Sequence, residues 1–181
     1  QIDSVSYLPT WGGNVGGKSL ERISAYALSN NPANWGSSTS SNKATPGSIN
    51  SITPKDNDLT ISSFKSENDY GIIGDEIQFT VVVKNIGLNT LSNYTINIFR
   101  DANKDSIAQQ SELISSQNGL VINPQDNSTF NFSTTDFIAG NNIFISIVNA
   151  VPDDDTTNNF SYKNIVGVSI NEVRNDIVIN E

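Results

Sequence analysis

Six segments in the second part of the chain alternate apolar with polar residues or run apolar, with β-branched and aromatic residues, as β-strands do. They are DLTISSFKS (58–66), EIQFTVVVKN (76–85), YTINIFRD (94–101), STFNFSTTDF (128–137), NIFISIVNA (142–150) and NFSYKNIVGVSI (159–170). Turn-forming residues separate the segments, for example Asn-Asp-Tyr-Gly at 68–71. About seven short strands over roughly 110 residues predict an all-β chain built on an immunoglobulin-like antiparallel β-sandwich.

The same period of two predicts the core. In the segment 76–85, one face carries apolar side chains and the other face includes Gln78 and Thr80. Three segments are expected to supply inward-facing residues: Ile77, Phe79, Val81, Val83, Tyr94, Ile96, Ile98, Ile143, Ile145 and Ile147. Because apolar residues at strand spacing usually pack inward, we interpret these stripes as core and not as a binding surface.

Changes in composition divide the chain into four parts. Residues 1–50 are rich in Gly, Ser and Asn and contain only short apolar runs. Residues 51–57 are polar and include Pro54, which is typical of a linker. Residues 58–170 contain the predicted strands, and residues 171–181 form a separate final segment.

Three motifs in residues 58–170 match a known module. Asp58–Ile61 reads D-L-x-I, Gly74–Gly87 reads G-D-E-I-x-F-T-V-x-V-x-N-x-G, and Asp153–Asn159 is an acidic stretch that ends in Asn-Asn before the last strand. With these motifs the region resembles CARDB, a bacterial cell-adhesion-related module. The resemblance implies an immunoglobulin-like fold on secreted multidomain proteins, with adhesion or spacing as the role.

The flanking segments resemble a second immunoglobulin-like module, the bacterial lamin-tail domain. The matching residues are I-D-S-V-S-Y (2–7), Trp11, G-K-S-L-E-R (17–22), N-x-P-x-N-W (30–35) and A-T-P-G-S-I-N (44–50). Their order implies that residues 1–50 are the closing part of such a domain, hence a partial second β-sandwich, and that residues 171–181 resemble the opening strand of another.

A partial sandwich leaves sheet edges unpaired, and such edges recruit strands. The segment Val168–Glu181 alternates apolar and polar residues and is long enough to form a strand. We therefore expect it to complete the sheet of residues 1–50 by strand addition, within one chain or between copies of the chain. A tail without a partner sheet is the alternative.

Charge and composition narrow the partners. Nineteen acidic residues against ten basic ones give a net charge of −9, which excludes ordinary nucleic-acid binding. No apolar run approaches ~18 residues, so we expect no membrane insertion. The chain has no Cys, which favours a secreted or cell-surface bacterial protein of the disulfide-poor kind.

The chain also has no His. Without His or Cys, it cannot form a Ser-His-Asp triad, a Cys nucleophile or an ordinary zinc site. Only paired carboxylates remain as catalytic candidates, and no motif marks such a pair. The sequence therefore predicts a protein that is not an enzyme.

The strongest candidate for chemistry is the loop Asp101–Glu112 (DANKDSIAQQSE). Asp101, Asn103, Asp105 and Glu112 place side-chain oxygens at positions 1, 3, 5 and 12, and Ile107 offers its carbonyl at position 7, as in a calcium-binding loop. Ser106 replaces the usual Gly at position 6, and a strand precedes the loop instead of a helix. The alternative is a hairpin loop whose Asn and Asp side chains cap their own backbone.

Other groups of interest have plainer interpretations. We expect Asp153, Asp154 and Asp155 to lie in a solvated loop, and Glu21 to be a surface charge. Trp11, Tyr26 and Trp35 either pack together or form a platform for a sugar, and we favour packing for the two Trp residues.

Two functions fit these observations. The first is a non-catalytic extracellular module that spaces or displays its neighbours on a surface or filament, stabilised by calcium and assembled by strand exchange with neighbouring β-modules or other copies. The second is an accessory module of a secreted hydrolase that binds surface polysaccharide. Whether the tryptophans are exposed or buried would help to distinguish these two functions.

Overall fold

The computed structural model describes residues 4–8, 10–12 and 16–170. It divides the chain into two compact units, Gln1–Pro54 and Lys55–Glu181, at a position inside the residues 51–57 that were expected to be a linker. The chain is all-β, as predicted. In the described ranges the helical elements are three single 3₁₀ turns, η1 (Pro32–Asn34), η2 (Gln110–Glu112) and η3 (Thr156–Asn158), and none of them could cross a membrane.

In its described residues, the first unit contains one small sheet. Its strands, β1 (Leu20–Arg22) and β2 (Trp35–Ser37), pair antiparallel with Glu21 opposite Gly36. Three-residue strands form few backbone hydrogen bonds. Side chains therefore form many of the hydrogen bonds in this unit. Asn34, for example, accepts from the Ser24 amide at 2.9 Å and donates to the Ser24 carbonyl at 2.9 Å.

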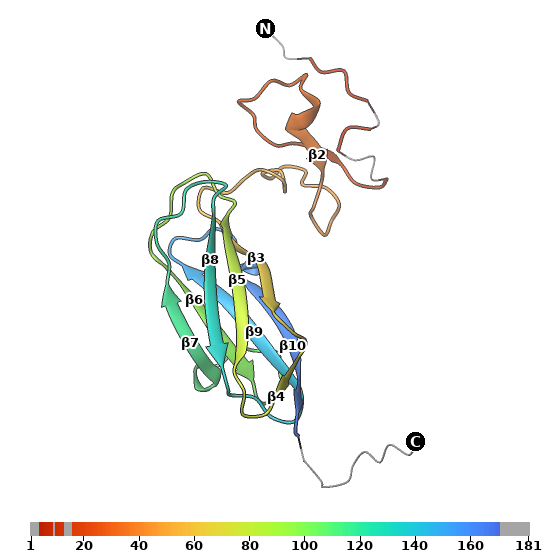
Figure 1. The fold of residues 1–181 in the computed structure, drawn as a ribbon. Helices are drawn as coiled ribbons and strands as arrows, with labels where there is room; N and C mark the ends of the chain where they lie inside the picture. The colour runs from red at the N-terminus through yellow and green to blue at the C-terminus, as the bar shows by residue number, and fades with distance from the viewer. Residues whose placement is uncertain (1–3, 9, 13–15, 171–181) are drawn as a thin grey trace, which may run out of the picture. The chain divides into compact units, whose positions relative to one another are not determined.

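The second unit is a sandwich of two sheets, drawn from yellow to blue in Figure 1. A three-stranded sheet has the order β3-β5-β8, and a five-stranded sheet has the order β4-β10-β9-β6-β7. The strands are β3 (Leu59–Ser66), β4 (Tyr70–Ile72), β5 (Ile77–Asn85), β6 (Tyr94–Asp101), β7 (Leu113–Asn118), β8 (Asn127–Thr134), β9 (Gly140–Ala150) and β10 (Phe160–Val168). The predicted immunoglobulin-like sandwich is confirmed.

All strand pairs of the sandwich are antiparallel except one, β4 with β10. The chain leaves the smaller sheet after β3 and joins the larger one as β4, which runs parallel to β10 with Gly71 opposite Gly167. The sequence did not predict β4, and residues 68–71 were expected to be a turn. A three-residue strand is too short to show a period of two, so its pairing comes from its neighbour β10 alone.

The core lies between the two sheets around Phe79. This side chain is 1% exposed, and its ring centroid is 5.4 Å from that of Phe64 and 4.8 Å from that of Phe144 in the opposite sheet. The inward faces predicted for β5 and β6 are confirmed, because the apolar residues of both are buried: Ile77, Phe79, Val81, Val83, Tyr94, Ile96 and Ile98.

The inward face predicted for β9 is wrong. Phe144 and Val148 belong to the core, whereas Ile145 pairs with Tyr162 and Phe99 on the outer face of the sheet. Ile143 and Ile147 share that outer face, because they lie two residues away on either side. The segment IFISIV is apolar at both parities, so alternation alone could not choose the face.

The end of the G-D-E-I motif has a direct structural explanation. Asn85 is fully buried, donates to the carbonyls of Asn89 (2.8 Å) and Ile122 (3.1 Å), and accepts from the Gly87 amide at 3.0 Å. A Cβ on Gly87 would lie 2.6 Å from the backbone nitrogen of Asp58. The N-x-G sequence is therefore required where this turn packs against the start of β3.

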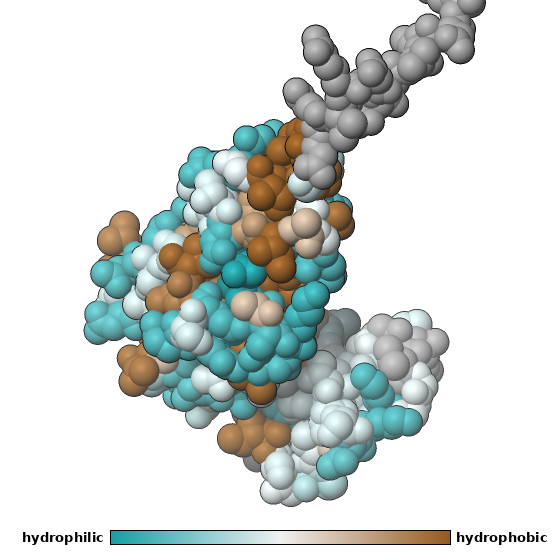
Figure 2. Space-filling view, turned by 90° about the horizontal axis from the view of Figure 1, so that it is seen from below, coloured by the Kyte–Doolittle hydropathy of each residue, from teal (hydrophilic) through white to brown (hydrophobic). Residues whose placement is uncertain are grey.

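The chain enters the sandwich at one end and leaves it at the other (Figure 1). At the first end, the Thr60 hydroxyl donates to the Asn158 carbonyl at 3.0 Å, just before β10 begins. At the second end, Val168 accepts from the Ile73 amide at 2.9 Å. Figure 2 shows hydrophobic side chains gathered where the described chain ends. There Ile73 Cδ1 and the backbone of Ile138 lie next to Gly167, and Ile73, Ile138 and Val168 are all exposed.

Candidate functional site

The predicted calcium loop connects β6 to β7 and closes on its own side chains. Asp101 is 2% exposed; its Oδ1 accepts from the Asp105 amide at 3.2 Å, and its Oδ2 from the Ser106 amide at 2.9 Å. Ser106 has a φ of 64°, the left-handed conformation for which Gly is usual at this loop position. Ser106 therefore adopts the backbone conformation that Gly usually takes at this position of a calcium-binding loop.

Glu112 closes the loop from its other end. Its Oε1 accepts from the amides of Ala102 (2.8 Å) and Asn103 (3.3 Å), and its Oε2 from that of Gln109 (3.3 Å). The Asn103 side chain donates to Asp105 Oδ2 at 2.9 Å. The fold thus gathers in one loop the side chains that the sequence had indicated. Every oxygen of the three carboxylates, those of Asp101, Asp105 and Glu112, accepts an N–H.

These bonds are the self-capping arrangement that was the alternative to calcium. Within the described ranges, no group of three or more acidic, His or Cys side chains is placed to hold a metal ion. Ile107, expected to offer its carbonyl, has a side chain that is 62% exposed. Calcium binding at this loop stays a prediction.

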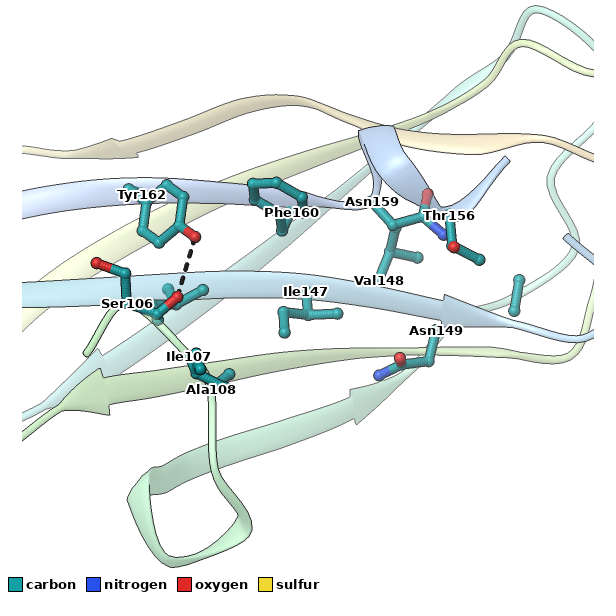
Figure 3. A pocket seen from close by; sticks show the side chains of 12 residues that line it. Ser106, Ile107, Ala108, Ile147, Val148, Asn149, Thr156, Asn159, Phe160 and Tyr162 are labelled. Carbon is teal, nitrogen blue, oxygen red and sulfur yellow. Dashed lines mark hydrogen bonds between the residues drawn. The ribbon is translucent and has the colours of Figure 1, made fainter. Parts of the chain in front are cut away.

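The loop also lies over the outer face of the five-stranded sheet. Phe99 and Ile145 are only 7% and 2% exposed although they lie outside the main core. The Tyr162 hydroxyl donates to the Ser106 carbonyl at 3.2 Å and holds the loop against the strands (Figure 3). The reversed face of β9 is therefore covered by the loop next to it, which sequence alternation could not reveal.

An open groove of about 440 Å³ runs between this loop and the strands (Figure 3). Ile107 and Ile147 line it together with the half-exposed rings of Phe160 and Tyr162, which meet edge to face at a centroid distance of 5.5 Å. Asn149 and Thr156 add polar groups. No motif in the sequence pointed to this surface.

A second polar cluster lies where the chain enters the sandwich. Asp58 is 5% exposed and accepts from Asn158 Nδ2 at 2.9 Å, while Asp153 Oδ2 accepts from Asn159 Nδ2 at 2.9 Å. Asp154 is exposed, but Asp153 and Asp155 are partly buried, so the expected solvated loop holds for Asp154 alone.

The charges of this cluster act on one another. Burial raises the pKa of Asp58; the bond from Asn158 and the charge of Lys55 lower it, and the charges of Asp153 and Asp155 add to the increase. The pKa of Asp155 is lowered, mainly by a hydrogen bond from the Thr157 hydroxyl. Ionised Asp58 is thus disfavoured by its surroundings.

Glu21 of β1 is the residue that sequence reasoning misjudged most. It is 4% exposed and not a surface charge, and it accepts from Thr45 Oγ1 (2.7 Å), from the Ser51 amide (2.7 Å) and from Ser51 Oγ (2.6 Å). Burial alone would raise its pKa, but the hydrogen bonds from Ser51, Thr45 and Ser38 outweigh burial and lower the pKa from 4.5 to about 2.

The two tryptophans of the first unit contact each other. The ring centroids of Trp11 and Trp35 are 6.2 Å apart, both side chains are partly buried, and Trp35 Nε1 donates to the Ser29 carbonyl at 2.8 Å. Tyr26, the third member of the possible sugar platform, is fully exposed. The geometry of the Trp pair is that of packing residues.

Comparison with known proteins identifies the fold of the sandwich. No family model and no curated protein matches the chain. The CARDB domain of the PF1109 protein from Pyrococcus furiosus, in complex with di-metal ions, is 18% identical with a TM-score of 0.52, over 64% of this chain and 92% of that one. A solution structure of the same domain is 19% identical with a TM-score of 0.51, over 63% and 97%.

A domain of a Methanosarcina acetivorans protein, described as a cell surface protein, is 15% identical with a TM-score of 0.49, over 65% of this chain and 97% of that domain. The comparisons with the Pyrococcus furiosus domain establish the fold and leave the lamin-tail resemblance of the flanks untested. The unit that begins at Lys55 has the fold of CARDB domains, an immunoglobulin-like β-sandwich.

Proposed function

We propose that this chain is a non-catalytic structural module of a cell-surface or extracellular protein, in which the sandwich spaces its neighbours. The observation that carries the proposal is the opposite placement of the two ends of the sandwich. Between them β10 runs nine residues from Phe160 to Val168, roughly 30 Å of extended chain. Modules with this geometry join end to end and add length.

The strand order suits a tensile load. Force on the two ends of the chain would pull β3 and β4 toward the end where the chain enters the sandwich and β10 toward the end where it leaves. The parallel pair β4 and β10 would then be sheared, and the bonds Val166 N–H to Asp69 O and Ile73 N–H to Val168 O, both 2.9 Å, would share the load. The ion pair of Lys163 with Asp69 adds to the same junction.

Single-molecule pulling tests this proposal. The chain has no Cys, so introduced pairs define the pulling direction. Lys55→Cys with Ser169→Cys loads the sandwich end to end, and Ala139→Cys with Ser169→Cys unzips β9 from β10, which pair antiparallel from Gly140 and Gly167. We expect clearly higher unfolding forces for the first pair. Equal or lower forces would count against a spacer under load.

Calcium at the loop belongs to the same proposal, with Asp101, Asn103, Asp105, the Ile107 carbonyl and Glu112 as ligands. The spacing of oxygens and the left-handed Ser106 support it, as does the di-metal complex of the Pyrococcus furiosus domain. Binding would raise the melting temperature, since the ion stabilises the folded state alone. Titration calorimetry of the chain and of Glu112→Gln measures it, and identical heats for both would contradict this site.

Strand addition is the proposed mode of assembly with neighbouring β-modules or other copies. The two three-residue strands of the first unit form a sheet that further strands would stabilise. Val168 belongs to β10, so the donor would begin after it. Deleting residues 171–181 should lower the molar mass in solution or expose residues 1–50 to protease. Unchanged mass and unchanged protection would refute the donor role.

An accessory polysaccharide-binding role is the second candidate. The half-exposed aromatic rings of Phe160 and Tyr162 in a groove with Asn149 favour it, because sugars stack on such rings and bond to amides. Glycan-array binding by the chain, lost in Phe160→Ala, is the expected result of this alternative. Binding that survives this substitution would place any sugar site elsewhere.

A further inference from the structure

One face of the five-stranded sheet carries no charge on three neighbouring strands. The outward side chains of β10 are Phe160, Tyr162, Asn164, Val166 and Val168. The residues paired with them are Ile or Asn in β9, and Tyr70 and Ile72 in β4. The chain has nineteen acidic and ten basic residues, and none of them occupies these positions. The outer face of the other sheet, by contrast, carries Lys65 and Lys84.

The outward stripe of β10 is exposed from one end of the strand to the other. The exposed fractions are 48% for Phe160, 46% for Tyr162, 49% for Val166 and 40% for Val168, and Asn164 is exposed as well. The nine residues of β10 span roughly 30 Å, and three adjacent strands are about 14 Å wide. Monomeric proteins rarely expose a continuous apolar patch of more than a few hundred Å². The face therefore has the properties of an interaction surface.

The order of side chains along the stripe is complementary to itself. Asn164 is its middle residue; two aromatic rings precede it and two valines follow it. A second copy of β10, laid antiparallel on the first with a twofold axis at Asn164, would bring Tyr162 onto the partner's Val166 and Phe160 onto the partner's Val168. Each large ring then faces a small side chain. A parallel copy would instead place ring on ring and valine on valine.

The amide at the centre of the stripe suits a twofold axis. Within residues 4–8, 10–12 and 16–170, the Asn164 side chain makes no hydrogen bond. An amide has both donors and an acceptor, so two copies of Asn164 can satisfy each other through a pair of equivalent bonds. Two such side chains and the bond between them span about 10 Å, the usual distance between packed sheets. A single polar residue of this kind can fix the register of two apolar surfaces.

The shape of the face fits the same arrangement. The groove of about 440 Å³ beside the loop Asp101–Glu112 lies at the Phe160 end of the stripe (Figure 3). The exposed Val168 and Ile170 lie at the other end. A twofold axis at Asn164 brings the Val168 end of each copy to the groove of the other.

The charge of the chain favours a second copy on this face over a charged partner. A net charge of −9 opposes contact between copies through most of the surface, and this repulsion is weakest where no charge is present. An acidic or basic partner would find no charge with which to pair. We propose that the outer face of the five-stranded sheet is a homodimer interface, in which two copies pack β10 on β10, antiparallel, about a twofold axis at Asn164.

This dimer differs from strand addition because it uses the face of a sheet and not an edge. A footprint of roughly 30 Å by 14 Å is at the small end of protein interfaces, so we expect reversible association with a dissociation constant on the order of tens of micromolar. The antiparallel arrangement puts the entry end of one sandwich beside the exit end of the other. It would join chains that run in opposite directions. The inference does not rest on the spacer role.

Sedimentation equilibrium of the full chain, from about 5 to 500 μM, tests the proposal around the expected dissociation constant. The natural chain should dimerise, and Asn164→Asp and Asn164→Lys should each weaken the dimer at least tenfold, because like charges meet at the axis. An equimolar mixture of the two variants should regain the dimer, since Asp on one copy then meets Lys on the other. A natural chain that stays monomeric throughout overturns the proposal and leaves the face to another occupant, such as a polysaccharide.

Asn127→Asp and Asn127→Lys are the matched controls. They make the same changes at an exposed residue of β8, paired with Lys84 on the outer face of the three-stranded sheet. Both should dimerise as the natural chain does, and circular dichroism checks that all four variants are folded. If Asn164→Asp associates as strongly as the natural chain, the contact lies on another surface and the proposal fails. If the mixture of Asn164 variants stays monomeric, the twofold axis does not pass through this residue.

Discussion

Glu21 illustrates how a single side chain can organise a region with little regular structure. Its bonds to Thr45 and Ser51 tie β1 to residues 24 and 30 positions later. The pKa of about 2 means that the folded unit prefers the ionised form more strongly than the unfolded chain does. Its contribution to stability is therefore complete above pH 4.5 and is lost as the pH falls from 4.5 toward 2.

We predict that the first unit loses stability between pH 4.5 and 2 and that Glu21→Gln removes most of this dependence. At neutral pH the variant should already be less stable, since a Gln nitrogen facing the Ser51 donors cannot accept from them. Urea titrations followed by Trp fluorescence measure this, because both Trp residues lie in residues 1–54. Asp3 is the other acidic residue there, so Asp3→Asn serves as control. A Glu21→Gln profile as steep as that of the natural chain would refute the assignment.

At the scale of elements, β9 and the loop Asp101–Glu112 depend on each other. β9 carries apolar residues on both faces; one face belongs to the core, and the loop covers Ile145 on the other. Glu112 holds this loop through the amides of Ala102, Asn103 and Gln109. The loop is thus a cover for the sheet as well as a candidate calcium site.

We predict that Glu112→Ala weakens the packing of the loop Asp101–Glu112 against the five-stranded sheet. Three amides lose their acceptor, and caps of this kind contribute about 1–2 kcal/mol. Lys104 is exposed at the tip of the loop, so trypsin should cut there faster in the variant than in the natural chain. Glu76→Ala, at an exposed turn of the same sandwich, is the control. Equal cleavage rates in all three proteins would mean that Glu112 does not hold the loop.

At the scale of the whole molecule, the division at Pro54 predicts two separate unfolding events. The described part of the first unit has one two-stranded sheet, whereas the sandwich has a continuous core around Phe79. Trp fluorescence reports the first unit, and far-ultraviolet circular dichroism reports mainly the strands of the sandwich. We expect the Trp transition at the lower temperature, moved further down by Glu21→Gln while the other stays fixed. Coincident transitions that move together would show one cooperative unit.

The sequence by itself determined the fold class, the six longer strands and the inward faces of β5 and β6. A period of two with polar residues on one side has a single solution, as in Ile77–Asn85. It also marked the loop Asp101–Glu112, because oxygen-bearing residues at short spacing are local in the chain.

Only the tertiary structure decided the face of β9, the strands β4 and β7, and the burial of Glu21. A segment that is apolar at both parities takes its face from its neighbours, and a short edge strand takes its pairing from the strand beside it. The cluster of Asp58, Asp153, Asn158 and Asn159 likewise exists only after folding, because its members come from opposite ends of the sandwich sequence. The local pattern of apolar and polar residues predicts a single strand. Which of its side chains are buried, and which charges lie near them, depends on the segments that the fold packs against that strand.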